Sequence, residues 1–271
     1  MTRDETRALY VYCFVRAGTP PPISSKGIDG ESEVTTLDLG EIAAVTSPIV
    51  LEEFLGPGGE VETPDLEWVA PRAMRHEQVI EEAMESSPVL PLTFGVVFSS
   101  GEALASAVSG HRRRIASFLD YIEDKEEWAV KVYANAEEVR AHVEHSDEFL
   151  QRLGRPPDAP GARYLHEKRL RRELDRVAAD ARRQMVERIR TALEPGAVEE
   201  KRLRLSPPEL TGRRDDMVLN AAFLEAEGQV EPFLQRVETL AEEYRPRGLT
   251  IEVSGPWPPF NFCPALGVGP P

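Results

Sequence analysis

SSPVLPLTFGVVFSS, residues 86–100, contains no charged residue, although 29% of the chain is charged. An apolar run of this length is buried in a protein core, in a membrane or against a partner. Pro91 lacks the backbone N–H that a central strand donates, and Gly95 permits a bend. We therefore predict an edge strand or a bulged strand here, and an apolar edge needs cover from another part of the protein.

The length and charge of the chain limit its class. A chain of 271 residues exceeds the usual ~100–200 residues of one domain, so two domains are expected. The net charge of −15 disfavours nonspecific binding to nucleic acid or to an anionic membrane. Residues 161–195 are the exception, with ten basic residues against six acidic ones, so binding of nucleic acid by this segment stays open as an alternative.

Cysteine content and hydropathy indicate a cytoplasmic protein. Cys13 and Cys263 are too few for a disulfide framework or a thiolate zinc site. Asp4 and Glu5 precede a short apolar run that Arg16 ends, which is unlike a secretory signal. No window approaches the ~20 apolar residues that a spanning helix needs, so we expect no membrane partner.

Strands and helices alternate in the first part of the chain. Strands are predicted at 8–17, in two short runs around Gly40 and at 88–98, where β-branched and aromatic residues lie between breakers. Apolar residues three or four apart predict helices at 64–86, with Pro71 as a kink or a boundary, and from Ser100 onward. We interpret residues 1–124 as an N-terminal α+β domain.

The order of elements changes after residue 124. We predict a strand at 126–134, helices that include a long amphipathic one at about 161–195, strands at 197–207 and 216–226, a helix at 230–248 and a last strand from 249. Strand, helices, strand, strand, helix, strand is the split βαβ order of a ferredoxin-like domain. The predicted fold class is α+β with two domains, and residues 125–271 form the ferredoxin-like domain with a proline-rich tail.

Motifs for chemistry are lacking. His142 and His145 lie three apart on one predicted helix, but spacing fixes no third metal ligand. The glycines of GPGG at 56–59 are not followed by the lysine of a phosphate loop, and no GxSxG elbow occurs. His76 is interpreted as part of a surface pair or a helix–sheet contact. We expect no catalytic residue, no cofactor and no metal, and hence no enzyme activity.

A second apolar segment, SGPWPPFNFCP at 254–264, lies near the end of the chain. Its prolines favour an extended backbone around Trp257, so that Trp257, Phe260 and Phe262 project from a stiff strap. Two interpretations stay open: the strap packs over its own domain and seals it, or it offers an aromatic surface to a partner.

Four segments together resemble one known family. They are LYVYCFV at 9–15, RHEQVIEEAMESSPVLPLTFGVVFSS at 75–100, WAVKVYA at 128–134 and LTIEVSGPWPPFNF at 249–262, and in order and spacing they are similar to the gas vesicle protein F/L family. The resemblance implies an accessory protein of gas vesicle assembly without catalytic activity, found in the cytoplasm and at the gas vesicle. It also implies a ferredoxin-like second domain and binding to the hydrophobic shell protein, to other accessory proteins, or to both.

Alternation along 89–98 suggests where such a partner binds. One face carries Val89, Pro91, Thr93, Gly95 and Val97, and the other carries the bulkier Leu90, Leu92, Phe94, Val96 and Phe98. If the bulkier set forms the core, a partner adds to the backbone edge by β-augmentation. The candidate partner-binding residues are Pro91, Thr93, Gly95, Val97, Trp257 and Phe260. The alternative function is that of a ligand-binding or enzymatic ferredoxin-like protein, which a polar pocket would favour.

Overall fold

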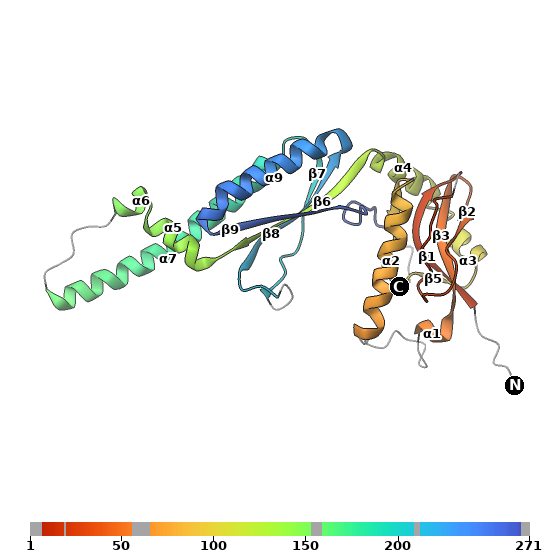
Figure 1. Ribbon diagram of the computed structural model, residues 1–271, viewed down its shortest axis with the longest axis horizontal. Helices are drawn as coiled ribbons and strands as arrows, with labels where there is room; N and C mark the ends of the chain where they lie inside the picture. Colours follow the sequence, from red (N-terminus) through yellow and green to blue (C-terminus); the bar gives the residue numbers. More distant parts are fainter. Residues whose placement is uncertain (1–6, 19, 56–65, 153–158, 209–211, 267–271) are drawn as a thin grey trace. The chain divides into compact units, whose positions relative to one another are not determined.

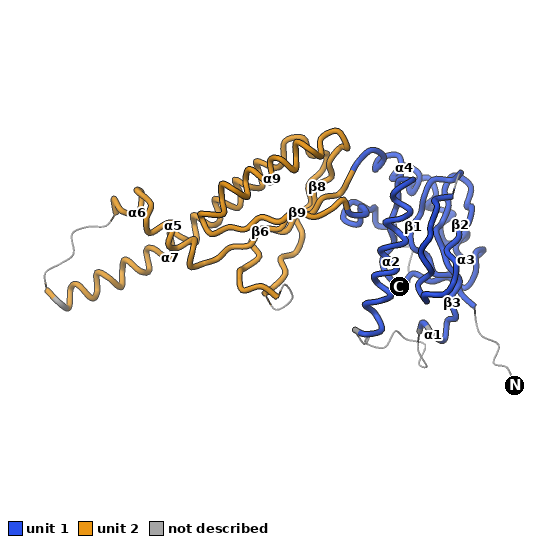
Figure 2. The backbone as a smooth tube through the Cα atoms, in the orientation of Figure 1, with its two compact units in different colours: residues 1–125, 257–271 blue, residues 126–256 orange. Residues whose placement is uncertain are grey.

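The computed structural model describes residues 7–18, 20–55, 66–152, 159–208 and 212–266, and within them two antiparallel sheets carry the fold (Figure 1). The chain divides into two compact units, which Figure 2 distinguishes by colour. The first unit comprises residues 1–125 together with 257–271, and the second comprises 126–256.

The sheet of the first unit is built around one fully apolar strand. Its strands are β1 (Arg7–Arg16), β2 (Thr35–Asp38), β3 (Ile42–Val50), β4 (Val89–Pro91) and β5 (Val97–Phe98). Their order is β2-β3-β1-β4, and β5 also pairs with β1. Residues 10–15 of β1 are all buried because both faces of the sheet are covered, which is why this strand reads as a continuous apolar run.

Helices cover this sheet: α1 (Leu51–Leu55), α2 (Leu66–Met84), α3 (Gly101–Val108) and α4 (Arg112–Ile122). Val79 and Ile80 of α2 are fully buried and pack with Tyr10 and Tyr12 of β1 in one cluster, which we call the α2-side core. Pro71 lies inside α2 and does not divide it. The Ser100 hydroxyl accepts a hydrogen bond from the Ala103 N–H at 3.2 Å, so this serine caps α3 as predicted.

The second unit has a four-stranded sheet and its own core. Its elements are β6 (Lys125–Ala134), α5 (Ala136–Glu144), α6 (Asp147–Leu150), α7 (Pro160–Leu193), β7 (Ala197–Arg202), β8 (Asp216–Ala226), α9 (Val230–Tyr244) and β9 (Leu249–Trp257), with short 3-10 turns at Glu227–Gln229 and Arg245–Arg247. The strands lie in the order β7-β8-β6-β9. Phe223 of β8 and Phe233 of α9 are fully buried, and their ring centroids are 5.4 Å apart.

The long helix α7 matches the predicted amphipathic helix within two residues at each end. Leu174, Met185, Ile189 and Leu193 are buried and form part of the core of the second unit. The apolar stripe is not buried over its whole length, because Tyr164 near the N-terminus of α7 is 64% exposed.

The tail residues lie in a different compact unit from the one in which the predicted division of the chain puts them. The predicted domain 125–271 includes the proline-rich tail, whereas residues from Trp257 onward belong to the first compact unit. Phe260 packs against the α2-side core, and Phe262 is 6% exposed. Phe260 of the strap thus buries apolar surface within the first unit. The two domain ranges themselves remain a prediction.

Candidate functional site

The apolar stretch forms two short strands separated by a turn. In β4, Leu90 pairs with Phe14 and Pro91 pairs with Cys13, and in β5 Val97 pairs with Tyr10. Between them the chain turns at residues 94–95, and Gly95 has φ of +95°, which a residue with a side chain adopts only with strain. The expected edge position of Pro91 and the expected bend at Gly95 are both present, since β4 ends the strand path of its sheet.

The predicted alternation of faces along this stretch is only partly correct. Leu90, Leu92 and Val96 are buried as expected, but Val89 and Pro91 of the opposite set are also buried. Two causes are evident: α2 and α4 both pack against β4, and the turn at Gly95 resets the alternation. Phe94 and Phe98 are consequently half-buried, and Thr93 is exposed.

A buried histidine fixes the position of this turn. His76 of α2 is 4% exposed, and its Nε2 lies 3.0 Å from the carbonyl oxygen of Leu92. Because a carbonyl only accepts, Nε2 carries the proton, and Nδ1 accepts from the Tyr10 hydroxyl at 3.0 Å. The same hydroxyl accepts from the N–H of Gly95 at 3.1 Å. These three hydrogen bonds therefore link α2 and β1 to both sides of the turn.

Burial keeps the side chains of His76 and Tyr10 neutral. Desolvation lowers the pKa of His76 to about 4, while the hydrogen bond to the Leu92 carbonyl opposes the shift. Desolvation likewise raises the pKa of Tyr10 well above its usual value. Around neutral pH the imidazole and the phenol thus act as hydrogen-bonding groups without charge.

Phe94 is held inward by the same aromatic surroundings. Its ring centroid lies 5.9 Å from that of His76 and 6.2 Å from that of Tyr10, both in edge-to-face geometry. The neighbouring Thr93 is the exposed residue of the stretch 89–98.

The strap residues contact the edge strand. The Cys263 thiol lies 3.8 Å from the Pro91 carbonyl oxygen and 3.2 Å from that of Pro259, so a residue from the tail covers the proline of β4. Phe260 and Val97 both pack against the α2-side core, whereas Trp257 is 36% exposed. Of the six candidate residues, Pro91 is buried, Gly95, Val97 and Phe260 are half-buried, and Thr93 and Trp257 are exposed.

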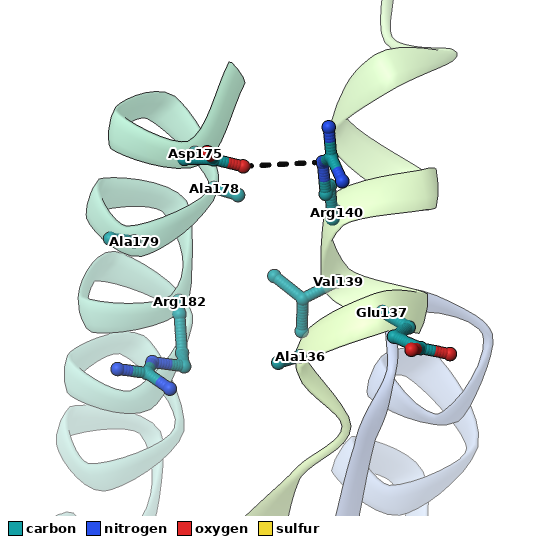
Figure 3. Close-up of a pocket in the computed structure, with 8 residues that line it drawn as sticks. All are labelled: Ala136, Glu137, Val139, Arg140, Asp175, Ala178, Ala179 and Arg182. Atoms are coloured by element: carbon teal, nitrogen blue, oxygen red, sulfur yellow. Dashed lines mark ion pairs between the residues drawn. The ribbon is translucent and has the colours of Figure 1, made fainter. Parts of the chain in front are cut away.

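Pockets in the described residues of the second unit offer little for catalysis. Figure 3 shows a pocket of about 260 Å³ between α5 and α7, in which Arg140 and Asp175 point toward one another with a 3.3 Å contact between Nε and Oδ1. The pocket places no nucleophile beside a base, and the small side chains of Val139, Ala178 and Ala179 form much of its wall.

Metal ligands and membrane helices are likewise missing from the described part of the chain. No group of three or more potential ligands from His, Cys, Asp and Glu occurs there. His145 instead directs Nδ1 to the Ala141 carbonyl at 2.8 Å, as a helix-end contact. The GPGG segment at 56–59 lies outside the described residues. None of the described helices combines the length and hydropathy needed to cross a membrane.

These features define an α+β protein with two antiparallel sheets whose described residues assemble no catalytic centre. The model of the family described as gas vesicle synthesis protein GvpL/GvpF matches residues 8–264, and the chain belongs to this family. The family comprises structural and accessory proteins of gas vesicles and is not enzymatic, and membership implies partners among gas vesicle proteins.

Relatives and solved structures agree with this assignment. The chain is 29% identical over 262 residues to gas vesicle protein L of Streptomyces sp. (strain CB03234), covering 95% of this chain and 93% of the relative. It is 27% identical over 255 residues to gas vesicle protein F of the same strain, covering 93% and 98%. The crystal structure of the gas vesicle protein GvpF from Anabaena sp. PCC7120 has the same fold, with a TM-score of 0.70, 19% identity and coverage of 96% and 97% of the two chains.

Proposed function

We propose that this protein is an accessory factor of gas vesicle assembly that binds the hydrophobic shell protein, other accessory proteins, or both, in the cytoplasm and at the growing vesicle. The observation that carries the proposal is the turn at residues 93–95, which a buried histidine holds in place. Beside the exposed Thr93, the apolar side chains of Phe94, Val97 and Phe98 are only half-buried. A shell subunit with one water-repelling face aggregates unless that face is masked, and an accessible apolar corner on a strongly charged protein provides such masking.

Side chains at the turn, more than the free edge of β4, are the proposed contact. Pro91 has no N–H to donate, and its carbonyl oxygen is contacted by the Cys263 thiol, so an added strand finds few partners there. Thr93 and Trp257 are exposed, and Val97 and Phe260 are half-buried beside apolar neighbours. We assign Pro91 and Gly95 the role of shaping the surface, and Thr93, Val97, Trp257 and Phe260 the role of touching the partner.

The second unit supports a ferredoxin-like assignment. Its elements follow the order β6, helices, β7, β8, α9, β9, and its strands lie in the order β7-β8-β6-β9, which matches the split βαβ arrangement read in reverse. We propose that it acts as a second interaction module and that the predicted domain boundary near residue 124 separates it from the shell-binding unit.

Replacing Thr93 with lysine is expected to weaken shell binding while leaving the fold intact. An ammonium group at this exposed position costs the fold little. It must lose water when an apolar partner covers it, which weakens binding. We expect a loss of about tenfold in affinity, which corresponds to ~1.4 kcal/mol. The measurement is co-purification of the full chain with co-expressed shell protein. Thr35→Lys on the exposed side of β2 is the matched control, because it adds the same charge at the opposite end of the sheet. Normal shell binding by a folded Thr93→Lys variant would contradict the proposed contact.

A further inference from the structure

A groove of about 740 Å³ lies in the second unit between α7, the segment at residues 204–208 and the start of β8. We call it the α7 groove. Its apolar lining is accessible in part, since Leu205 is 47% exposed while Met217 is 7% exposed. The apolar side chains that line it are Val186, Leu205, Pro207, Pro208, Met217 and Val218.

The groove exists because the chain leaves the sheet after Arg202. A strand is predicted at 197–207, but β7 ends at Arg202. The pairing with β8 extends one residue further, because the Leu203 N–H donates to the Asn220 carbonyl at 2.8 Å. Beyond this point the Asn220 side chain donates to the Arg204 carbonyl at 2.9 Å, and the Ser206 N–H contacts the Met217 sulfur at 3.3 Å. Residues 203–207 have no regular secondary structure and form the wall opposite α7, and a helical turn begins at Pro208.

The charges at the groove favour an anion. Three arginines line it, Arg182, Arg183 and Arg204, against the two acids Glu187 and Asp216. Both acids are already paired: Asp216 lies 3.5 Å from Arg182, and Glu187 lies 2.7 Å from Arg190 and 3.2 Å from Arg202. Arg182 and Arg183 are paired as well, with Asp216 and Asp180, so among the described lining residues the surplus positive charge lies on Arg204.

We propose that the α7 groove binds an acidic peptide segment with apolar side chains, contributed by a partner protein. An extended segment places alternate side chains on opposite sides, so leucine-like residues meet Leu205 and Val186 while a carboxylate meets Arg204. The volume lies within the range of ~300–1,000 Å³ that ligand-binding clefts occupy. This surface is separate from the proposed shell-binding turn, which belongs to the first unit.

The lining distinguishes a peptide from a nucleic acid. Single-stranded nucleic acid is held by aromatic side chains on which bases stack, and none of the described residues that line the groove is Phe, Tyr or Trp. Aliphatic side chains beside the arginines match a peptide that carries both carboxylates and apolar groups. Of the ten basic residues in 161–195, Arg182 and Arg183 line this groove, and its lining favours a peptide over a nucleic acid.

The test uses the full-length protein and fluorescence anisotropy with a labelled ten-residue peptide of alternating Glu and Leu. A peptide of alternating Glu and Ser keeps the negative charge without apolar side chains, and one of alternating Lys and Leu keeps the apolar side chains with the charge reversed. A single-stranded DNA decamer probes phosphate binding. We expect only the Glu–Leu peptide to bind, and Arg204→Glu to weaken it by about tenfold or more. Arg188→Glu is the matched control, because this exposed arginine lies on the same helix outside the groove lining.

The proposal is overturned if the Glu–Leu peptide fails to bind, if the Glu–Ser peptide or the DNA binds as tightly, or if Arg188→Glu weakens binding as much as Arg204→Glu. A Leu205→Ser variant adds a second readout, since it removes exposed apolar surface without changing charge. It is expected to weaken the Glu–Leu peptide, and unchanged affinity in that variant would reject the apolar part of the site.

Discussion

Replacing Leu92 with aspartate is expected to unfold the first unit. The Leu92 side chain is 6% exposed, its N–H donates to the Tyr12 carbonyl at 2.9 Å, and its carbonyl accepts from His76. A carboxylate at this position would be buried without a partner, which costs several kcal/mol in addition to the lost apolar burial of ~2 kcal/mol. Single domains are stable by only about 5–15 kcal/mol, so the change removes much or all of the margin.

The measurement is urea unfolding followed by near-ultraviolet circular dichroism. Thr93→Asp provides the matched control, because it introduces the same charge one residue away at an exposed position and is expected to unfold like the wild type. A Leu92→Asp variant with a wild-type unfolding midpoint would show that this side chain is not part of the core.

Acidification is expected to destabilise the first unit through His76. The pKa of His76 is about 4 in the folded protein and about 6.5 when unfolded, so between these values the unfolded chain binds the proton first. Stability therefore falls as the pH drops from about 6.5 to 4, and this single group accounts for a loss of up to about 3 kcal/mol once the pH is below 4.

The pH dependence is measured by urea unfolding at intervals between pH 7 and pH 4. Glutamine at position 76 offers a carbonyl to the Tyr10 hydroxyl and an N–H to the Leu92 carbonyl, but it does not titrate. His76→Gln is therefore expected to fold and to lose stability less steeply over this range, with the remaining slope due to carboxylates. Equal slopes for the wild type and His76→Gln would show that His76 titrates normally.

Features set by neighbouring residues were predictable from the sequence. The β2–β3 hairpin follows from Gly40, which has φ of +95° and whose backbone N–H donates to the Asp38 carboxylate at 2.8 Å. Asn135 caps α5 by accepting from the N–H groups of Glu137 and Glu138, each at 3.1 Å. Such signals require only a few adjacent residues, so one sequence contains them in full.

Features that depend on distant pairs were not predictable. Tyr10 and His76 are 66 positions apart, and no local pattern indicates that the phenol and the imidazole share a hydrogen bond. The contact between Cys263 and Pro91 spans 172 positions, so the sequence left open whether the strap seals a domain and which one. The α7 groove depends on the early end of β7 at Arg202. The strand-like sequence pattern continues to residue 207, but the register between β7 and β8 ends at Arg202 and Ala221.

Hydrogen exchange of the full-length protein, with and without the shell protein, tests the central claim most directly. The account predicts slower amide exchange in the complex at residues 92–98 and in the strap from Trp257 to Phe262, because a bound partner excludes water from the turn that His76 holds. A complex that forms while slower exchange is confined to residues 126–256 would contradict it and would place the shell-binding surface on the second unit.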